Sequence, residues 1–435
     1  MKPNAVQIRP GRVGGRLHAP PSKSETHRAY LLAARSDEPC RVRFPLKAED
    51  TQATLSCLHD LGARLHLQDE DVQFLPAPFR SPRQPLDCRN SGTTLRLLTA
   101  MAATLPYEVT LTGDDSLRTR PNGALLDALR SLGARCDSVD GRAPLTIRGP
   151  VRAGAVTLPP GASSQFASAL VLALAAVPGI STVQLTAPLA SSPYLDVTLQ
   201  VAAEFGLRIH DSLGNGRRLD IEGGIAPHAS RFNVAGDWSA AAFPLVAAAI
   251  TGGSVTVTGV LSASHQGDRA IIDHLRAFGA DAKAGEDTAS CAAAALASPG
   301  TVDVSQTPDL FPALCVLAAA SRGTTTFVGA SALRHKESDR ITAMATGLAR
   351  MGVAVAERPD GLVVTGGNLQ GASLASAGDH RIHMALAVAA LAANGPSTLD
   401  DPGCVAVSWP GFHKAMLGLD ASLTLLYGNR AEVAS

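Results

Sequence analysis

Residues 125–147 read LLDALRSLGARCDSVDGRAPLTI, and this stretch holds one complete helix-strand-turn-strand pattern. An apolar run at helical spacing ends at Gly133, because a left-handed helix end strains any residue that has a side chain. The next residues, 134–138, predict a strand, Asp140-Gly141 predicts a turn, and 145–147 predict a second strand. The stretch therefore predicts a helix followed by a β-hairpin.

The same pattern recurs along the whole chain. Helical segments end in apolar-Gly-apolar triplets at Gly62, Gly133, Gly206, Gly279, Gly352 and Gly418, with separations of 71, 73, 73, 73 and 66 residues. Strand patterns such as 353–356 and 362–364 follow these glycines. Such regular spacing indicates an internal repeat, so we predict six repeats of roughly 72 residues, each ending a helix at its glycine.

Each repeat alternates helices with strands, which indicates an α/β fold. An elongated array of stacked repeats is one possible arrangement. A repeat of this length can bury its own helices on its own sheet, however, so three repeats packed into each compact domain are more economical.

Composition excludes several classes of partner. The 435 residues are 46% hydrophobic, which is enough for large cores, and 38 basic residues balance 38 acidic ones. Without a net field, the chain is not expected to bind nucleic acid or a membrane surface. Any anion must be bound by locally gathered cations.

The sequence also predicts a cytoplasmic location. Residues 1–7 lack the apolar core of a signal peptide, and the most apolar run, 167–180, is too short to span a bilayer. The seven cysteines are widely spaced and form no CxxC pair, so we expect buried free thiols and no structural zinc.

The predicted helix starts in the first half carry groups that suit an anion. Ser22 and Glu25 fit a capping box, and Lys23, Ser24 and Arg28 follow on the first two turns. The second start has Asn90 as the expected cap, Gly92 for close backbone approach and Arg96 one turn later; the third has Ser163, Ser164 and Gln165.

The second half mixes cations with carboxylates at its helix starts. Pro308 occupies a first helical position beside Asp309, and two more helices open at 335–340 and 379–381. Each motif alone fits an ordinary cap or a solvated cation. Together they place cations repeatedly against the positive end of a helix dipole, which indicates a polyanionic small-molecule ligand.

These motifs resemble those of a known family along essentially the whole chain. They are Pro21-Ser22-Lys23-Ser24 with Arg28, Asn90-Ser91-Gly92-Thr93 with Arg96, Arg120-Pro121, Ser163-Ser164-Gln165-Phe166, Ser191-Ser192-Pro193-Tyr194, Gln266-Gly267-Asp268, Pro308-Asp309, residues 334–340 (RHKESDR) and Asp379-His380-Arg381. In this order and spacing the chain resembles the 5-enolpyruvylshikimate-3-phosphate synthases.

The resemblance implies a two-domain inside-out barrel with three βαβαββ units in each domain. It places residues 20–235 in the N-terminal domain and residues 1–19 with 236–435 in the C-terminal domain, so the chain should cross near Pro20 and Gly236. The active site is expected in the interdomain cleft.

The resemblance also implies a reaction and its residues. The enolpyruvyl group of phosphoenolpyruvate would pass to the 5-hydroxyl of shikimate 3-phosphate through a tetrahedral ketal, with release of phosphate. Shikimate 3-phosphate would be bound by Lys23, Ser24, Arg28, Ser163, Ser164, Gln165, Ser191, Tyr194, Asp309 and Lys336. Phosphoenolpyruvate would be bound by Lys23, Asn90, Gly92, Thr93, Arg96, Arg120, Gln165, Arg340, Asp379, His380 and Arg381.

Four residues are expected to carry the chemistry. Glu337 is the candidate acid that protonates the methylene carbon, and Asp309 is the candidate base for the hydroxyl. Lys336 would tune both carboxyl groups, and Lys23 would neutralise substrate charge. The resemblance implies no cofactor or metal, a monomer, and glyphosate as a candidate inhibitor.

The chain departs from the family pattern at three positions. Val407 stands where family members commonly carry a Lys near the C-terminus. Arg89 replaces the Gly before the Asn-x-Gly-Thr turn, and Ala332 replaces an Asn that is found in some members. One hypothesis is that Arg89 replaces the charge lost at Val407; the alternative is that Arg89 points to solvent.

Three other functions fit the sequence less well. The sister family that acts on UDP-N-acetylglucosamine usually has a Cys in the loop equivalent to 114–120, and no cysteine lies there. A non-catalytic binding descendant would not need a paired acid and base. An interaction module of stacked repeats would not need both at the same helix starts.

Overall fold

A computed structural model describes residues 3–428 and 430–432 apart from 188, 190 and 215. The chain divides into two compact units, which we call the N-terminal unit (Pro21–Val234) and the C-terminal unit (Met1–Pro20 with Ala235–Ser435). Both divisions lie one residue from the crossings expected near Pro20 and Gly236.

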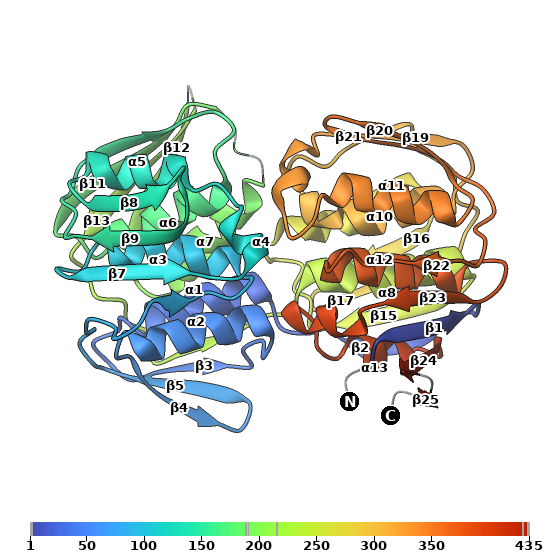
Figure 1. Cartoon of the computed structure of the whole chain (residues 1–435), viewed down its shortest axis with the longest axis horizontal. Coiled ribbons are helices and arrows are strands. Elements are labelled where there is room, and N and C mark those ends of the chain that lie inside the picture. Colours follow the sequence, from blue (N-terminus) through green and yellow to red (C-terminus); the bar gives the residue numbers. More distant parts are fainter. Residues whose placement is uncertain (1–2, 188, 190, 215, 429, 433–435) are drawn as a thin grey trace. The chain divides into compact units, whose positions relative to one another are not determined.

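The N-terminal unit contains three four-stranded sheets (Figure 1). Their strand orders are β14 (Arg231–Asn233), β3 (Cys40–Arg43), β5 (Asp71–Leu75), β4 (Arg64–Gln68); β6 (Leu86–Asp87), β7 (Glu108–Thr112), β9 (Arg142–Arg148), β8 (Arg135–Val139); and β10 (Ala155–Leu158), β11 (Gly179–Leu185), β13 (Gly216–Gly223), β12 (Arg208–Gly214). Its helices are α1 (Lys23–Ala33), α2 (Glu49–Asp60), α3 (Gly92–Ala102), α4 (Asp115–Arg118), α5 (Gly123–Ser131), α6 (Ser164–Leu174) and α7 (Pro193–Glu204).

The C-terminal unit contains two four-stranded sheets and one five-stranded sheet. Their strand orders are β16 (Asp281–Ala284), β17 (Thr288–Ala292), β15 (Ser254–Thr258), β2 (Gly14–His18); β18 (Thr301–Asp303), β19 (Thr324–Val328), β21 (Gly361–Thr365), β20 (Ala354–Arg358); and β22 (Ser373–Leu374), β23 (Ser397–Asp400), β1 (Ala5–Arg9), β24 (Ser422–Tyr427), β25 (Arg430–Glu432). Its α-helices are α8 (Trp238–Thr251), α9 (Ile271–Ala277), α10 (Phe311–Ala319), α11 (Arg340–Arg350), α12 (His380–Leu391) and α13 (Phe412–Leu417). Short 3-10 helices are η1 (Gly267–Ala270), η2 (Pro308–Leu310), η3 (Ser331–His335) and η4 (Pro402–Val407).

All six sheets share one pairing rule. A parallel pair, such as β10 with β11, is extended by antiparallel strands, such as β13 and β12; there are two of these in each four-stranded sheet and three in the five-stranded sheet. In five sheets these two strands are consecutive in sequence, as β12 and β13 are, whereas in the last sheet β1 from the N-terminus pairs between β23 and β24. The pattern confirms the predicted α/β class and the βαβαββ repeat.

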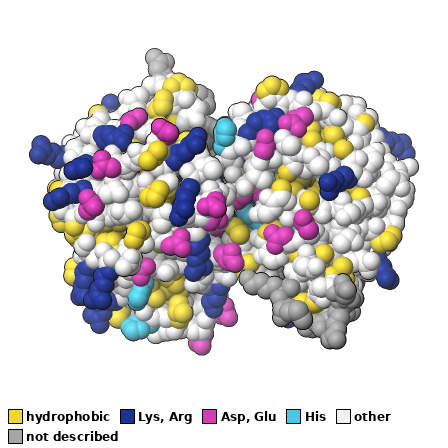
Figure 2. Space-filling model, in the orientation of Figure 1, with side chains coloured by type: hydrophobic (Ala, Val, Ile, Leu, Met, Phe, Trp, Pro, Cys, Tyr) yellow, Lys and Arg dark blue, Asp and Glu magenta, His cyan; other side chains and the backbone are white. Residues whose placement is uncertain are grey.

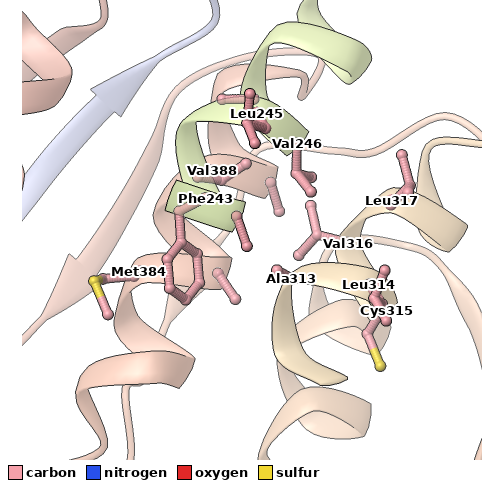
Figure 3. Packing of buried hydrophobic residues seen from close by; sticks show 14 of the residues in the cluster. Phe243, Leu245, Val246, Ala313, Leu314, Cys315, Val316, Leu317, Met384 and Val388 are labelled. Carbon is pink, nitrogen blue, oxygen red and sulfur yellow. The ribbon is translucent and has the colours of Figure 1, made fainter. Parts of the chain in front are cut away.

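Helices form the interior of each unit. In the C-terminal unit α8, α10 and α12 contact one another, and nearly all of their residues are buried. Figure 3 shows side chains of these three helices meeting, with Phe243, Val316 and Val388 among them. Helices that are apolar all round belong in such a core, and they leave only their ends for polar chemistry.

Five of the six predicted helix-ending glycines are left-handed. Gly62, Gly133, Gly206, Gly279 and Gly352 have φ between +75° and +102°. At Gly133 the backbone N–H bonds to the carbonyl of Arg130, and that of Ala134 bonds to the carbonyl of Leu129. This is the Schellman motif, and the other four glycines repeat it.

The prediction for Gly418 is wrong. Its φ is −64°, and the left-handed residue of the sixth repeat is Asp420 at φ +64°. The N–H groups of Asp420 and Ala421 bond to the carbonyls of Leu417 and Met416, which makes the same Schellman motif. An aspartate tolerates this conformation better than most residues, so the position did not stand out in the sequence.

The surface matches the balanced composition. Figure 2 shows basic and acidic side chains interspersed over the face drawn, with hydrophobic side chains in small separate patches.

All seven cysteines are buried and free, as predicted. Among the described residues, no helix is long and apolar enough to cross a membrane.

Gly133→Ala is expected to lower the free energy of unfolding by about 1 kcal/mol, because an L-residue is strained in the left-handed region. A Cβ there meets nothing within 4 Å, so strain would be the sole cause. Gly123→Ala, on the same helix α5 and equally uncrowded, is the control and should leave stability unchanged or slightly raised. Urea unfolding checks both, and equal values would contradict the assignment.

Candidate active site

Helix α1 begins as predicted. Ser22 is its N-cap and its hydroxyl oxygen accepts the backbone N–H of Glu25 at 3.3 Å. Lys23, the first helical residue, donates from Nζ to Oδ2 of Asp50 on α2 at 2.8 Å. The carboxylate offsets the cost of a cation at the positive end of the helix dipole.

Arg28 is buried, and protein oxygens surround its guanidinium. Nε donates to Oγ1 of Thr198 at 2.7 Å, and the two Nη atoms donate to the carbonyl oxygens of Ser24 and Tyr194 at 2.8 and 2.9 Å. Burial lowers its pKa to about 10, which still leaves it charged at neutral pH. These bonds tie α1 to α7.

The cap of helix α3 differs from the prediction. Ser91, not Asn90, is the N-cap, and its hydroxyl oxygen accepts the N–H of Thr94 at 3.2 Å. The amide of Asn90 instead donates to Asp114 at 2.6 Å and accepts from Arg120 at 2.7 Å. The local pattern could not distinguish Asn90 from Ser91, because both are good caps.

Two guanidinium groups lie beside the first turn of α3. A Cβ on Gly92 would lie 3.1 Å from Nη1 of Arg120 and 3.9 Å from Nη1 of Arg96. Arg120 is 5% exposed, so its charge is held close to the turn. Backbone N–H groups and two cations at one helix start make this turn a candidate anion site.

Helix α6 supplies the neighbouring group. Ser163 is its N-cap, and Gln165 accepts from Arg96 at 2.5 Å and donates to Thr93 at 3.1 Å. The guanidinium of Arg96 also lies over the ring of Phe166, 5.2 Å from its centroid. The starts of α3 and α6 are thus bonded to each other.

The start of α7 is held by a residue that the sequence did not single out. Arg217 donates to the hydroxyl of Ser192 at 3.2 Å and to Asp196 at 2.6 Å. Ser191 just before is left-handed, with φ +61°, and Tyr194 lies on the first turn. Arg217 lies in β13, 25 residues from Ser192 in the sequence, so only the folding of the sheet brings it to this helix start.

In the C-terminal unit one carboxylate, Asp309, gathers three predicted cations. Its two oxygens accept from Arg340 at 2.9 Å and Arg381 at 3.0 Å, and Nζ of Lys336 lies 4.0 Å away. Asp309 lies in η2, directly before α10. This cluster brings together the starts of α10, α11 and α12.

Arg340 links three carboxylates. Besides Asp309, it donates to Glu337 at 2.7 Å and to Asp379 at 2.8 Å, while being only 1% exposed. Burial opposes its charge, but Asp379, Glu337 and Asp309 outweigh burial and raise the pKa of Arg340. Burial would likewise raise the pKa of Asp379, but Arg340 outweighs it and the pKa is lowered.

Asp268 is a carboxylate of this cluster to which the sequence assigned no role. It is 3% exposed, and its Oδ2 accepts a hydrogen bond from Ser239 on α8. Burial, followed by the charge of Asp309, raises its pKa to about 7. The motif Gln266-Gly267-Asp268 was the available signal, since it belongs to the resembling stretches.

Helix α12 is anchored behind this cluster by two histidines. Nε2 of His383 and Nε2 of His413 lie 3.0 Å apart, and Nδ1 of His383 lies 3.0 Å from the carbonyl oxygen of Asp400. Burial lowers the pKa of His383 to about 3 and that of His413 to about 4. Both rings are therefore neutral near pH 7.

The three residues that depart from the family pattern lie in different environments. Arg89 is exposed and left-handed, with φ +51°, which explains why a glycine suits this position. Val407 is half-buried at the end of η4, and Ala332 is exposed in η3.

The described residues contain no group of three or more His, Cys, Asp or Glu that could hold a metal.

Six βαβαββ repeats give the chain the fold of the enolpyruvyl transferases. The enolpyruvyl transferase NikO from Streptomyces tendae matches the fold at a TM-score of 0.78 and 17% identity, over 100% of both chains. EPSP synthase from Acinetobacter baumannii matches at a TM-score of 0.81 and 29% identity, over 97% of this chain and 99% of that one.

Sequence comparison gives the particular family. The model for EPSP synthase (3-phosphoshikimate 1-carboxyvinyltransferase) matches residues 8–416. The 3-phosphoshikimate 1-carboxyvinyltransferase of Halobacterium salinarum is 44% identical, over 95% of this chain and 98% of its own. That of Methanocorpusculum labreanum is 41% identical, over 95% and 97%. The chain belongs to the EPSP synthase family, as the motifs predicted.

The histidine pair predicts loss of stability in mild acid. Because both folded pKa values are lowered, the unfolded state binds more protons below pH 6.5, and stability falls as the pH drops from 6.5 towards about 4. Each ring should contribute a loss of about 2 kcal/mol at pH 5.

Urea unfolding between pH 7.5 and pH 5 measures this loss. His413→Gln should reduce the pH dependence, since glutamine takes up no proton. His59→Gln, at a histidine whose side chain is 72% exposed, is the control and should behave as the wild type. Identical pH dependence in all three proteins would contradict the assignment.

Proposed function

We propose that the clusters at the helix starts carry out the family's reaction in this chain. The chain is a transferase that moves the enolpyruvyl group of phosphoenolpyruvate to the 5-hydroxyl of shikimate 3-phosphate, in aromatic amino-acid biosynthesis. The observation that carries the assignment of residues is the cluster of Asp309, Glu337 and Arg340, since it joins two carboxylates through one buried cation.

Asp309 is the proposed base. The reaction adds the 5-hydroxyl oxygen to C2 of phosphoenolpyruvate while the hydroxyl proton passes to a base. Arg340 and Arg381 hold the two carboxylate oxygens of Asp309 in fixed positions. Nζ of Lys336 lies 4.0 Å from Oδ1 of Asp309, so both side chains would contact the same substrate hydroxyl. A preorganised carboxylate of this kind needs little rearrangement when the proton moves.

Glu337 is the proposed acid, which delivers a proton to the methylene carbon. In the described structure Arg340 holds Glu337, and a nearby cation favours the ionised form of a carboxyl group. The carboxylate of phosphoenolpyruvate would compete for the same guanidinium. Release from Arg340 would then allow Glu337 to take up a proton from solvent and deliver that proton to the methylene carbon.

The anion-binding residues of the N-terminal unit would hold the substrates. For phosphoenolpyruvate these are Lys23, Gly92, Thr93, Arg96, Arg120 and Gln165, with Asn90 orienting Arg120, and the C-terminal unit adds Arg340, Asp379, His380 and Arg381. For shikimate 3-phosphate they are Lys23, Ser24, Ser163, Ser164, Gln165, Ser191 and Tyr194, with Asp309 and Lys336 at its hydroxyls. Arg28 would act by holding the carbonyl groups of Ser24 and Tyr194.

Several expectations stay predictions. They are the active site in the interdomain cleft, the monomeric state, the cytoplasmic location, the absence of a cofactor, glyphosate as a ligand, and Arg89 as a replacement for the charge missing at Val407.

Phosphate release from the two substrates tests the proposed roles. Asp309→Asn and Glu337→Gln should each lower kcat by at least about 100-fold, because each removes a proton-transfer group. Glu357→Gln is the control, since Glu357 pairs with Arg334 outside the cluster and should leave kcat unchanged. Phosphate release by either cluster variant at the wild-type rate would refute its assigned role.

Gly92→Ala tests the anion site at α3. Its Cβ would press on Arg120 at 3.1 Å, so the guanidinium must shift by a few tenths of an ångström. We expect KM for phosphoenolpyruvate to rise by about tenfold, equivalent to one lost hydrogen bond. KM for shikimate 3-phosphate should stay the same, and Gly123→Ala provides the control; equal rises in both KM values would argue against the site.

A further inference from the structure

A chain of buried hydrogen bonds runs behind the anion-binding turn of α3. Nδ1 of His27 on α1 lies 2.7 Å from Oγ1 of Thr54 on α2, and that atom lies 2.7 Å from Oγ1 of Thr94 on α3. Thr94 in turn donates to Oγ of Ser91, the N-cap, at 2.7 Å. All four side chains are fully buried.

The donors of this chain can be assigned by counting protons. Thr94 has one hydroxyl proton, and its acceptors are Oγ of Ser91 and the carbonyl oxygen of Asp50, so Thr54 must be the donor to Thr94. Thr54 has then used its own proton and must accept one from Nδ1 of His27. The bonds from His27 to Thr54 and from Thr54 to Thr94 therefore both point towards the first turn of α3.

The state of His27 agrees with this direction. Burial, and after it the charges of Lys23 and Arg28, lower the pKa of His27 well below its ordinary value, so the ring is neutral. With the proton on Nδ1, Nε2 carries none, and Nε2 has no hydrogen-bond partner among the described residues. A neutral Nδ1–H tautomer is what the one-way chain requires.

A second link joins the same three helices. The hydroxyl of Thr94 also lies 3.3 Å from the carbonyl oxygen of Asp50, whose carboxylate accepts from Lys23. Asp50 and Thr54 are one turn apart on α2, as are Lys23 and His27 on α1. Helix α2 therefore links α1 to the first turn of α3 twice, once through Asp50 and once through Thr54.

We propose that His27, Thr54 and Thr94 are positioning residues, which fix Ser91 and the first turn of α3 so that Gly92 faces phosphoenolpyruvate. The proposal rests on the proposed function of that turn. None of the three would touch the substrate. Their bonds lie in a dry interior, where hydrogen bonds in a chain polarise and strengthen one another.

Removing one hydroxyl would release the cap. Without the bond from Thr54, Thr94 and Ser91 could rotate, and the N–H groups at Gly92 would lose their fixed direction relative to Arg120. Catalysis and binding are sensitive to such small displacements, because the ligand must be held in one geometry. The effect should fall on phosphoenolpyruvate, since the cap of α6 at Ser163 is not part of this chain of bonds.

The experiment compares three variants. Thr54→Val removes the hydroxyl at nearly constant volume, and Thr54→Ser keeps it. Thr99→Val is the matched control, because Thr99 is equally buried but, among the residues that the structure describes, its hydroxyl bonds only to the carbonyl of Leu95 in its own helix. KM for each substrate and kcat are measured by phosphate release.

The expected result is a rise of about tenfold in KM for phosphoenolpyruvate in Thr54→Val, with KM for shikimate 3-phosphate unchanged. Thr54→Ser and Thr99→Val should behave as the wild type. Equal KM values in Thr54→Val and Thr99→Val would overturn the positioning role, while the proposed function would stand. Absence of phosphate release by the wild type would instead overturn the proposed function.

The tautomer of His27 gives an independent measure. Proton–nitrogen NMR spectra of histidine-labelled wild type should show a neutral Nδ1–H ring that changes in Thr54→Val and not in Thr99→Val. If Thr54→Val does not fold, His27→Phe, which removes the far end of the chain of bonds, undergoes the same KM comparison against Thr99→Val. An Nε2–H tautomer in the wild type would overturn the assigned direction.

Discussion

Positive charge at the N-terminus of a helix opposes the helix dipole, and this chain repeats that arrangement at several helix starts. Several of these cations are offset by nearby carboxylates. Lys23 is bound to Asp50, and Arg340 to Asp309, Glu337 and Asp379. The rest of the site depends on this constraint, because the same cations must be available to an anionic substrate and yet be tolerated inside the folded unit.

The carboxylates that stabilise the cations are also the groups proposed for proton transfer. Asp309 and Glu337 share Arg340, so an arriving anion would redistribute one guanidinium among competing partners. Buried charges are favourable only when they are well paired, and this makes the pairing itself responsive to the ligand. In the proposed reaction, the charge of the substrate and the protonation of Glu337 would therefore be coupled through Arg340.

Precise helix starts also need support from behind. Ser22, Ser91 and Ser163 cap helices α1, α3 and α6 of the N-terminal unit, and each cap fixes N–H groups that could bind an anion. At α3 the cap is bonded further to Thr94, Thr54 and His27. The interior of the unit is thus part of the proposed site, although only its surface would meet the substrates.

The sequence by itself determined the repeat, the α/β class, the cap at Ser22, and the family, because helix ends and caps depend on residues close together in the chain. It failed at Gly418 and Asn90, where two neighbouring residues could each fill the same local role. Only the tertiary structure decided that β1 completes the last sheet, that Arg28 bonds to Thr198, and that Arg340 joins three carboxylates. These contacts join residues that are distant in sequence, and only packing fixes which of several possible partners each one meets.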